Sequence, residues 1–458
     1  METTQPTELA SSRPEADQST VRRAAWAGLI GTALENYDFV IYGTASAIIF
    51  NKLFFPNVSP VVGVLASFAA YAVGFGARPL GGLFFSRFGD RLGRKWILIA
   101  TLLLMGTATL AIGLLPTYEM VGLWAPALLV ACRFLQGFGA GAEQAGGAIL
   151  LTETAHRDRR GRLSSLIFVG AAAGSALGAV MWMLVQMLPD EQFEAWGWRL
   201  VFLNSIFVTV AALLIRRKLQ ESPVFQELKQ NSHEAKTPVS QVLRHGRRPL
   251  ARVFFMNVGA NAHSYIYQVF LGSYLINVLD TSSRIVPKVL LVGSLVAMIA
   301  AYVAGSASDR FGRRPVYLFI TGVLVLLPVP AFVLLNTRET WAIVVVIVLG
   351  FAFAAQGTVG VQASYFPELF GARYRYAGVT LGREFSSVFG GGVAPMIAAA
   401  LLTAFADSWW PVAVYMMAMM LISFAATLMS PETRGRDLGV FEDAAVKPQD
   451  TALPGRSD

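Results

Sequence analysis

The sequence has few charged residues and almost no cysteine, and each shortage excludes a class of protein. Of the 458 residues only 14% are charged, whereas 55% are hydrophobic. A soluble domain averages about 25% charged residues, so most of this chain does not face water. The single cysteine, Cys132, has no partner within the chain, which excludes a disulfide framework and a cysteine metal site.

The motifs of enzymes and of cofactor-binding proteins are also missing. The sequence contains no nucleotide-binding loop, no cluster of metal-ligating residues and no pairing of a nucleophile with a base. The net charge of +8 could indicate a nucleic-acid partner, but the Arg and Lys residues occupy short loops between apolar segments. We therefore expect no enzymatic activity, no cofactor, no bound metal and no nucleic-acid partner.

A basic turn occurs twice, half a chain apart. The segment GDRLGRK at residues 89–95 reappears as SDRFGRR at residues 308–314, and long apolar runs flank both copies. Gln136-Gly137 and Gln356-Gly357 repeat at nearly the same spacing. Internal symmetry of this kind is typical of membrane carriers built from two similar halves.

The apolar runs predict an all-α membrane protein with twelve transmembrane helices in two six-helix repeats, since a span needs about 20 apolar residues. The first set is predicted at 24–50, 60–85, 96–115, 121–152, 163–188 and 198–216. The second set is predicted at 250–278, 286–308, 315–336, 340–366, 376–405 and 409–430. We expect residues 1–23 and 431–458 to be disordered tails and 217–249 to be a middle loop between an N-terminal bundle (24–216) and a C-terminal bundle (250–430).

The distribution of basic residues predicts the orientation. The loops after the second, fourth and sixth predicted spans are rich in Arg and Lys, and the alternate loops are nearly bare of them. The positive-inside rule therefore places the basic loops and both termini in the cytoplasm. Residues 1–20 lack the basic-then-apolar order of a secretory signal, so the first span is expected to direct insertion into the cell membrane.

Ionisable side chains inside the predicted spans are the first functional candidates, because each costs roughly 2.5–3.5 kcal/mol at mid-helix. Glu35 and Asp38 lie three residues apart on one helix face, and a desolvated carboxylate can take up a proton near neutral pH. Arg133 can offer a planar fork to a substrate carboxylate or to a carboxylate on the first helix. Glu143, further along the fourth span, is another proton-site candidate. The alternative for each is a structural ion pair or hydrogen bond.

Further polar side chains inside the spans could contact a substrate. They are Arg78, Tyr37, Tyr42, Asn261, His263, Gln268 and Arg383. Arg78 and Arg383 could instead extend to the membrane interface. His263 could serve as a proton relay or as a satisfied polar side chain, and the aromatic residues could simply pack.

The basic turns and nearby acidic residues are candidates for a gate. These residues are Asp90, Arg91, Arg94, Glu153, Asp309, Arg310, Arg313 and Glu368. Pairing between them when the cytoplasmic side is closed would set the balance between inward-open and outward-open states. The alternative is that the arginines only determine topology.

Glycines supply two mechanical predictions. Gly170, Gly174 and Gly178 recur at helical spacing, which indicates a close helix contact. Gly390-Gly391-Gly392 with Pro395 should loosen or kink the eleventh span and could form a hinge.

These motifs resemble the major facilitator superfamily. GDRLGRK and SDRFGRR resemble its signature between the second and third and the eighth and ninth helices. RFLQGFGAGAE resembles its fourth-helix motif, whose arginine, here Arg133, is implicated in proton coupling. YDFVIYGTASAIIFNKLFFP, ARPLGG, WGWRLVFL, LQESPVF and FPELFGARYRYAG resemble the metabolite:proton symporter branch, whose members carry shikimate, α-ketoglutarate, citrate or proline/betaine.

Two departures from the branch leave the substrate open. The usual Glu-Trp-Tyr-Asp of the first helix reads ENYD at residues 35–38, and the usual Gly-Glu-Trp-Gly-Gly of the fourth lacks its tryptophan at residues 142–147. The resemblance, which covers residues 24–437, implies a proton-coupled importer of a small polar metabolite that carries a carboxylate. It further implies that the protein works as a monomer in the bilayer of a bacterial inner membrane. An exporter or antiporter of the same fold and a membrane sensor without transport activity are the alternatives.

Overall fold

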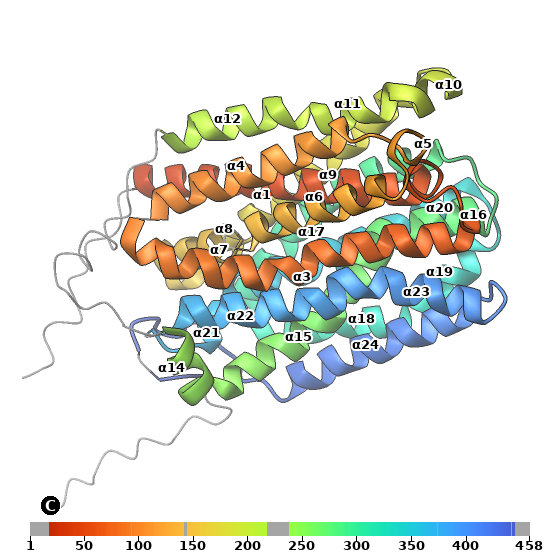
Figure 1. Ribbon diagram of the computed structural model, residues 1–458. Coiled ribbons are helices and arrows are strands. Elements are labelled where there is room, and N and C mark those ends of the chain that lie inside the picture. Colours follow the sequence, from red (N-terminus) through yellow and green to blue (C-terminus); the bar gives the residue numbers. More distant parts are fainter. Residues whose placement is uncertain are drawn as a thin grey trace, which may run out of the picture.

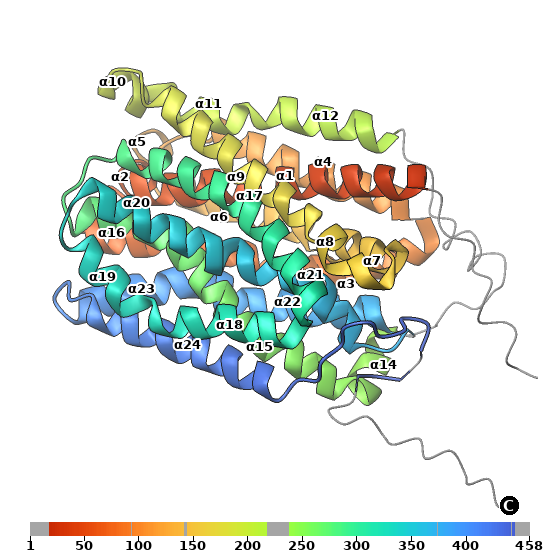
Figure 2. The ribbon, with the colours of Figure 1, turned by 180° about the vertical axis from the view of Figure 1, so that it is seen from behind.

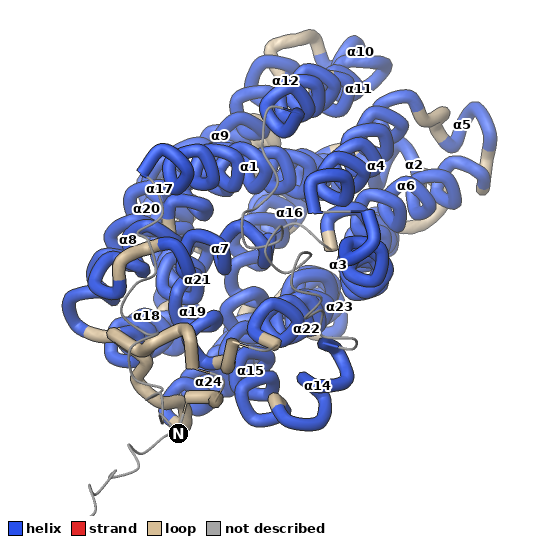
Figure 3. The backbone as a smooth tube through the Cα atoms, turned by 90° about the vertical axis from the view of Figure 1, so that its left-hand side faces the viewer, coloured by secondary structure: helices blue, strands red, loops and turns tan. Residues whose placement is uncertain are grey.

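The computed structural model describes residues 18–92, 94–141, 144–217, 238–372, 374–440 and 442–444, and every regular element within these ranges is helical. The long helices lie side by side and run along one common direction (Figure 1). Viewed from one end of the bundle, most of them are seen close to down their axes (Figure 3). The fold is therefore an all-helical bundle, as the hydrophobic runs predict.

The helices of the first half cover each of the six segments predicted there. Their bounds are α1 (Gln18–Ile48), α2 (Phe50–Phe54), α3 (Pro60–Leu92), α4 (Arg94–Leu114), α5 (Tyr118–Val121), α6 (Trp124–Ala140), α7 (Gln144–Thr154), η1 (Arg157–Arg159), α8 (Arg160–Ser164), α9 (Leu166–Val185), α10 (Asp190–Gln192), η2 (Phe193–Gly197), α11 (Trp198–Leu203) and α12 (Ser205–Arg217). The first helix begins earlier than predicted, so residues 18–23 are helical where a disordered tail was expected.

The second half is built in the same way. Its helices are α14 (Pro238–His245), α15 (Arg247–Tyr265), η3 (Ile266–Phe270), α16 (Leu271–Asn277), α17 (Ile285–Phe311), α18 (Arg313–Leu326), α19 (Pro328–Leu335), α20 (Thr340–Leu349), η4 (Gly350–Gly357), α21 (Thr358–Leu369), α22 (Arg375–Ser387), η5 (Val388–Gly392), α23 (Val393–Ala404) and α24 (Trp410–Leu428). Short α14 lies in the segment expected to be a middle loop.

Length and composition suit several of these helices for crossing a membrane. Among the described residues, six helices are long and apolar enough to do so. The pair formed by α18 and α19, which bend by 45° at their junction, would add a seventh. Of the twelve predicted spans, the one at 96–115 contains a shorter apolar helix, Ile99–Leu114.

Small residues bring α1 and α9 into close contact, as their spacing predicts. A side-chain carbon on Gly174 would overlap the backbone carbonyl of Ala33, and one on Gly170 would overlap that of Leu29. Only glycine leaves room for two helix backbones at this distance. The prediction that this stripe serves helix packing is therefore confirmed.

Several pairs of helices bring the two halves into contact within the described residues. Helix α9 packs along α17, and α3 packs against α22, η5 and α23. Helix α1 contacts η3 and α16, while α7 and α8 contact α21. Figure 2 shows α9 and α17 adjacent, with α21 below α8. Residues far apart in the sequence therefore meet along the centre of the bundle.

Three helices of the second half contain a turn of π-helix, at η3, η4 and η5. The third of these includes the run Gly390-Gly391-Gly392, where the sequence predicts a loosened helix. Irregular turns of this kind often mark functional positions in helices. The proposal that this run acts as a hinge remains a prediction.

Candidate functional site

Two buried carboxylates on α1 lie at the centre of the bundle. Glu35 is fully buried and Asp38 is 5% exposed. The sequence analysis singled out both residues as proton-site candidates. Because a charge away from water is costly unless it is paired, the partners of these two groups define the site.

Glu35 belongs to an ion triad that crosses between the halves. Its Oε1 lies 2.8 Å from Nη1 of Arg78 on α3. Arg78 also donates through Nε to Oε2 of Glu384 on α22, at 2.7 Å, and through Nη2 to Oε1, at 3.3 Å. We call Glu35, Arg78 and Glu384 the central triad; it joins two helices of the first half to one of the second.

The central triad corrects one interpretation of Arg78. The side chain is 2% exposed and held by two carboxylates, so it does not extend to a membrane interface. Arg383, the neighbour of Glu384, is 7% exposed, and its guanidinium lies 5.2 Å from the ring centroid of Phe168 on α9. Both arginines therefore point into the contact between the halves.

Asp38 and Arg133 are linked through two uncharged side chains. Thr109 on α4 donates from Oγ1 to Oδ2 of Asp38, at 2.8 Å. Gln136 on α6 donates from Nε2 to Oγ1 of Thr109, at 2.7 Å, and its Oε1 accepts a hydrogen bond from Nη1 of Arg133. We call Asp38, Thr109, Gln136 and Arg133 the polar chain. Gln136 and Thr109 thus connect Arg133 to a carboxylate of the first helix, and direct pairing of the Arg133 fork with a carboxylate remains a prediction.

Aromatic rings surround the guanidinium of Arg133, which is fully buried. Its central carbon lies 4.0 Å from the ring centroid of Tyr42 and 5.0 Å from those of Phe39 and Tyr71. Ring faces attract a cation more strongly where water is excluded. Tyr42, a predicted substrate contact, is thus a neighbour of Arg133.

The other predicted substrate contacts are distributed around this centre. Tyr37 points away from it, since its hydroxyl donates to the carbonyl of Val201 at 2.7 Å. Asn261 donates to Oγ of Ser387 at 3.0 Å, and Gln268 donates to Oγ of Ser264 at 2.6 Å. Glu143 lies outside the described residues.

His263 faces the interior of the second half. Its Nδ1 lies 3.2 Å from the carbonyl of Gly259, and its Nε2 lies 3.2 Å from the carbonyl of Leu324 on α18. Both neighbouring groups are carbonyl acceptors, so a neutral ring can donate to only one of them, and both are bound only when the ring is protonated. The role of His263 as a proton relay or as a structural polar side chain remains a prediction.

A second set of polar contacts lies at one end of the bundle, which we call the basic end. Helix α8 begins there, α17 ends there, and residues 431–440 and 442–444 lie there. Asp309 at the end of α17 accepts hydrogen bonds from the backbone N–H groups of Gly161 and Arg162, each at 2.8 Å. It also binds Nη1 of Arg313 at 2.6 Å. A carboxylate of the second half thus caps a helix of the first.

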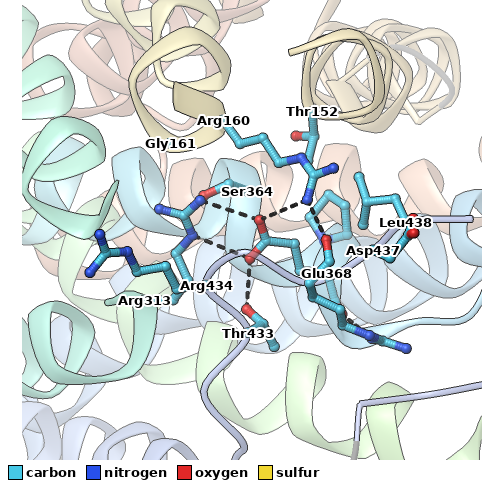
Figure 4. Close-up of polar contacts among 12 residues, drawn as sticks. Thr152, Arg160, Gly161, Arg313, Ser364, Glu368, Thr433, Arg434, Asp437 and Leu438 are labelled. Carbon is cyan, nitrogen blue, oxygen red and sulfur yellow. Dashed lines mark hydrogen bonds and ion pairs between the residues drawn. The ribbon is translucent and has the colours of Figure 1, made fainter. Parts of the chain in front are cut away.

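Glu368 is the centre of the buried network at the basic end (Figure 4). It is fully buried and lies 3.2 Å from Nε of Arg313. It also accepts a hydrogen bond from Oγ1 of Thr433 at 2.7 Å and lies 4.0 Å from Nη1 of Arg160. Arg160 belongs to the first half, so this network also crosses between the halves.

Further contacts reinforce the basic end. Arg375 on α22 lies 2.8 Å from Oε1 of Glu153, and Oγ1 of Thr152 donates to the carbonyl of Ala363 at 3.0 Å. The guanidinium of Arg310 lies over the ring of Phe311, outside the ion pairs described above. Asp90, Arg91 and Arg94 lie where α3 ends and α4 begins, and their side chains are outside the described part of the structure. Their part in a gate remains a prediction.

The segment after α24 forms a strap across the basic end, where a disordered tail was expected. Glu432 accepts hydrogen bonds from the backbone N–H groups of Arg313 and Arg314, each at 2.9 Å. The carbonyl of Arg436 accepts from Arg160 at 2.6 Å, and Asp437 lies 2.8 Å from Arg157. Polar composition suggested disorder, but these groups find partners on both halves, and the segment is therefore held in place.

The opposite end of the bundle also brings the halves together. Arg284, which precedes α17, lies 3.0 Å from Oδ1 of Asp190 on α10. Gly43 on α1 lies against Val269 on η3, so that an added side-chain carbon would come 2.8 Å from a methyl group of that valine. The halves therefore meet at both ends, with the central triad and the polar chain between them.

Metal binding finds no support in the described part of the chain, where no group of three or more His, Cys, Asp or Glu residues is arranged to hold an ion. The partners that sequence reasoning missed are Thr109, Gln136 and Glu384. Gln136 was visible as part of the repeated Gln-Gly pair, and Glu384 was visible as an acid within an apolar segment. Thr109 gave no signal, because threonine is unremarkable in a membrane helix.

Comparison with known proteins identifies the family. The sequence pattern of the Major Facilitator Superfamily matches residues 29–382. The shikimate transporter of Escherichia coli (strain K12) is 39% identical over 435 residues, which are 93% of this chain and 99% of that protein. The proline/betaine transporter of Salmonella typhimurium is 32% identical over 432 residues, 92% of this chain and 86% of that one.

Solved structures agree on the fold. The proton:xylose symporter XylE bound to 6-bromo-6-deoxy-D-glucose superposes with a TM-score of 0.72 at 16% identity, over 92% of this chain and 98% of that one. The resemblance to metabolite carriers that the motifs indicate is confirmed by these relatives. This chain is a multi-pass membrane protein of the transporter class, not an enzyme, and it belongs to the major facilitator superfamily.

Proposed function

We propose that this protein is a proton-coupled symporter that imports a small polar metabolite carrying a carboxylate, by alternating access across a bacterial inner membrane. Shikimate is supported by the name of one relative, and a di- or tricarboxylate is suggested by the resemblance of the motifs. Twelve spans in two bundles, 24–216 and 250–430, would cross the bilayer. The tails (1–23 and 431–458) and the loop 217–249 would lie in the cytoplasm, and a monomer would suffice for transport.

The observation that carries this proposal is the central triad. Arg78 is shared by a carboxylate from each half, so the halves cannot separate at this level without breaking a buried ion pair. Removing one partner of such a pair costs roughly 3–5 kcal/mol, because an uncompensated charge remains. A proton on Glu35 together with a substrate carboxylate on Arg78 would keep the site at two carboxylates for one guanidinium, as in the central triad.

This charge balance supplies a reason for coupling. If one proton enters for each substrate carboxylate, the net charge of the buried site does not change, and the cost of desolvation stays low. A substrate bound without its proton would add an unpaired negative charge. We assign proton binding to Asp38 and Glu35, with Glu143 as a further candidate, and substrate binding to Arg133 and Arg78.

Access to this site would alternate through the two ends of the bundle. The contacts of Asp309, Glu153 and Glu368 at the basic end hold the halves together there. We equate the basic end with the cytoplasmic side, because the arginine-rich loops lie there. Breaking these contacts, with the opposite end closed, would open the site to the cytoplasm.

The replacement Asp38→Asn tests this proposal in proteoliposomes that carry an inward proton gradient. We expect the variant to lose uphill accumulation of radiolabelled substrate while it retains exchange of substrate across the membrane, because the amide cannot cycle a proton. Asp280→Asn, in an exposed loop, is the matched control and should transport like the wild type. Unchanged accumulation in Asp38→Asn would remove this residue as the proton carrier.

Candidate substrates for the wild-type protein are shikimate, α-ketoglutarate, citrate, benzoates, proline and betaine. We expect one of the carboxylates to accumulate, and a protonophore to abolish its accumulation. Uptake that an outward proton gradient drives instead would indicate an antiporter of the same fold. A protein that binds these compounds but moves none of them would indicate a sensor.

A further inference from the structure

Two uncharged side chains stand between the proposed proton site and the buried arginine. Thr109 and Gln136, like Arg133, are fully buried, and they come from different helices, α4 and α6. The bonds from Gln136 to Thr109 and from Thr109 to Asp38 measure 2.7 and 2.8 Å. Buried polar groups without such partners destabilise a helix bundle, so the polar chain is a closely specified arrangement.

The direction of the hydrogen bonds is fixed by Arg133. Its guanidinium can only donate, so the amide oxygen of Gln136 must face it, and the amide nitrogen must face Thr109. The hydroxyl oxygen of Thr109 therefore accepts from Gln136 and has one proton to donate. Two acceptors lie within reach of that proton: Oδ2 of Asp38 at 2.8 Å and the carbonyl of Met105 at 3.0 Å.

The choice between these two acceptors depends on the proton of Asp38. When Asp38 is ionised, the hydroxyl of Thr109 donates to it. When Asp38 is protonated, the acid donates to the oxygen of Thr109, whose own proton turns to the carbonyl of Met105. The Thr109 hydroxyl is satisfied in both states, because a hydroxyl group can accept two hydrogen bonds at its oxygen and donate one through its proton.

We infer that Thr109 and Gln136 are positioning residues that transmit the protonation state of Asp38 to Arg133. The inference rests on the proposed function and deepens it. With Asp38 ionised, the polar chain runs from a cation to an anion and holds Arg133 towards Asp38. With Asp38 neutral, the positive charge of Arg133 is no longer balanced through the chain and is available for a substrate carboxylate. The proton itself enters from solvent on one side and leaves on the other, and no other group is consumed.

The surroundings of Arg133 support this assignment. The titratable groups near it, besides Asp38, include Tyr42 and Tyr71, which lie against the guanidinium, and Tyr265; the guanidinium of Arg78 also lies 5.3 Å from the ring centroid of Phe39. None of these tyrosines carries a negative charge at neutral pH. Among these neighbours, Asp38 at the end of the polar chain is thus the acid whose charge changes with proton binding.

Replacement of the Thr109 hydroxyl is the direct test. Thr109→Val keeps the shape of the side chain but removes the donor, and Thr109→Ser keeps the hydroxyl. Thr107→Val is the matched control, since Thr107 lies on the same helix, is exposed and binds only backbone carbonyls among its described contacts. The measurements are uphill accumulation of the transported carboxylate under an inward proton gradient, and substrate exchange without a gradient.

We expect Thr109→Val to lower the accumulation ratio by about fivefold or more, the lower range of coupling between two sites, while exchange remains measurable. Thr109→Ser should restore accumulation, and Thr107→Val should match the wild type. Gln136→Met, which breaks the same chain at the next link, should behave like Thr109→Val. Gln136 and Thr109 lie on different helices, so the same loss of accumulation in both variants would not be explained by a folding defect in one of them.

Three results would overturn the inference. The first is wild-type accumulation in both Thr109→Val and Gln136→Met. The second is failure of Thr109→Ser to restore coupling, and the third is loss of exchange in both broken-chain variants, since neither residue is assigned a part in translocation. Failure of the wild-type protein to accumulate any substrate would instead reject the proposed function itself.

Discussion

Replacement of Asp309 by Asn should open the basic end of the bundle. Asp309 accepts two backbone hydrogen bonds from α8 and binds Arg313. An asparagine has the same shape but one acceptor oxygen, so one bond across the halves and the negative charge are lost. A hydrogen bond to a charged group contributes about 1.5–3 kcal/mol, and a loss of about 2 kcal/mol would change the ratio of closed to open states by about 30-fold.

The distance between spin labels at Arg159 and His245 would measure this ratio. Both side chains are exposed, they belong to different halves, and Cys132 can be replaced by Ser to leave the labels unique. We expect a longer-distance population to grow in Asp309→Asn. The exposed Asp158, replaced by Asn, is the matched control and should leave the distances unchanged. Identical distance distributions in Asp309→Asn and the wild type would refute the role of this carboxylate in closing the basic end.

Two further predictions concern the same end of the bundle. Gly161→Ala should also favour the open basic end, because the added methyl group would overlap the backbone of α17. Gly76→Ala is the control and should leave the basic end closed, because a side-chain carbon at Gly76 meets open space. The distances between the same spin labels would measure both effects. The pKa of Asp437 is lowered by the backbone N–H of Gly439 and by Arg157. A lowered pKa stabilises the folded state above the ordinary value of about 3.9, and this stabilisation is lost as the pH falls. The melting temperature of Asp437→Asn should therefore be slightly lower than that of the wild type at pH 7, by an amount equivalent to less than about 1 kcal/mol because the pair is exposed. The difference should shrink as the pH falls below the ordinary value of about 3.9 and the carboxylate is protonated.

The sequence indicated candidate site residues and packing residues where an unusual residue type and a helical spacing occur together in one segment. Two carboxylates three residues apart in an apolar run are costly in a membrane, so Glu35 and Asp38 could be recognised without a structure. The glycine stripe of α9 could be recognised in the same way, because three glycines at helical spacing define a contact face. In each case one helix contained the whole signal.

Partners on distant helices could not be predicted from the same signals. Arg78 and Glu384 are 306 positions apart, and no local pattern says that α3 and α22 meet at this level. The strap was missed for a related reason: its composition is that of a disordered tail, and the buried groups that hold it, such as Arg160 and Glu368, belong to other elements. Long-range pairing of this kind depends on the packing of the bundle rather than on local propensity.

The central claim is that protons and a carboxylate substrate move inward together. The most direct measurement is the pH outside weakly buffered proteoliposomes after addition of shikimate, or of whichever carboxylate the uptake assay identifies. Symport predicts that the external medium becomes more alkaline as substrate enters, that a protonophore abolishes the change, and that Asp38→Asn shows none of it. Acidification of the medium, or substrate entry without any change in pH, would contradict proton symport.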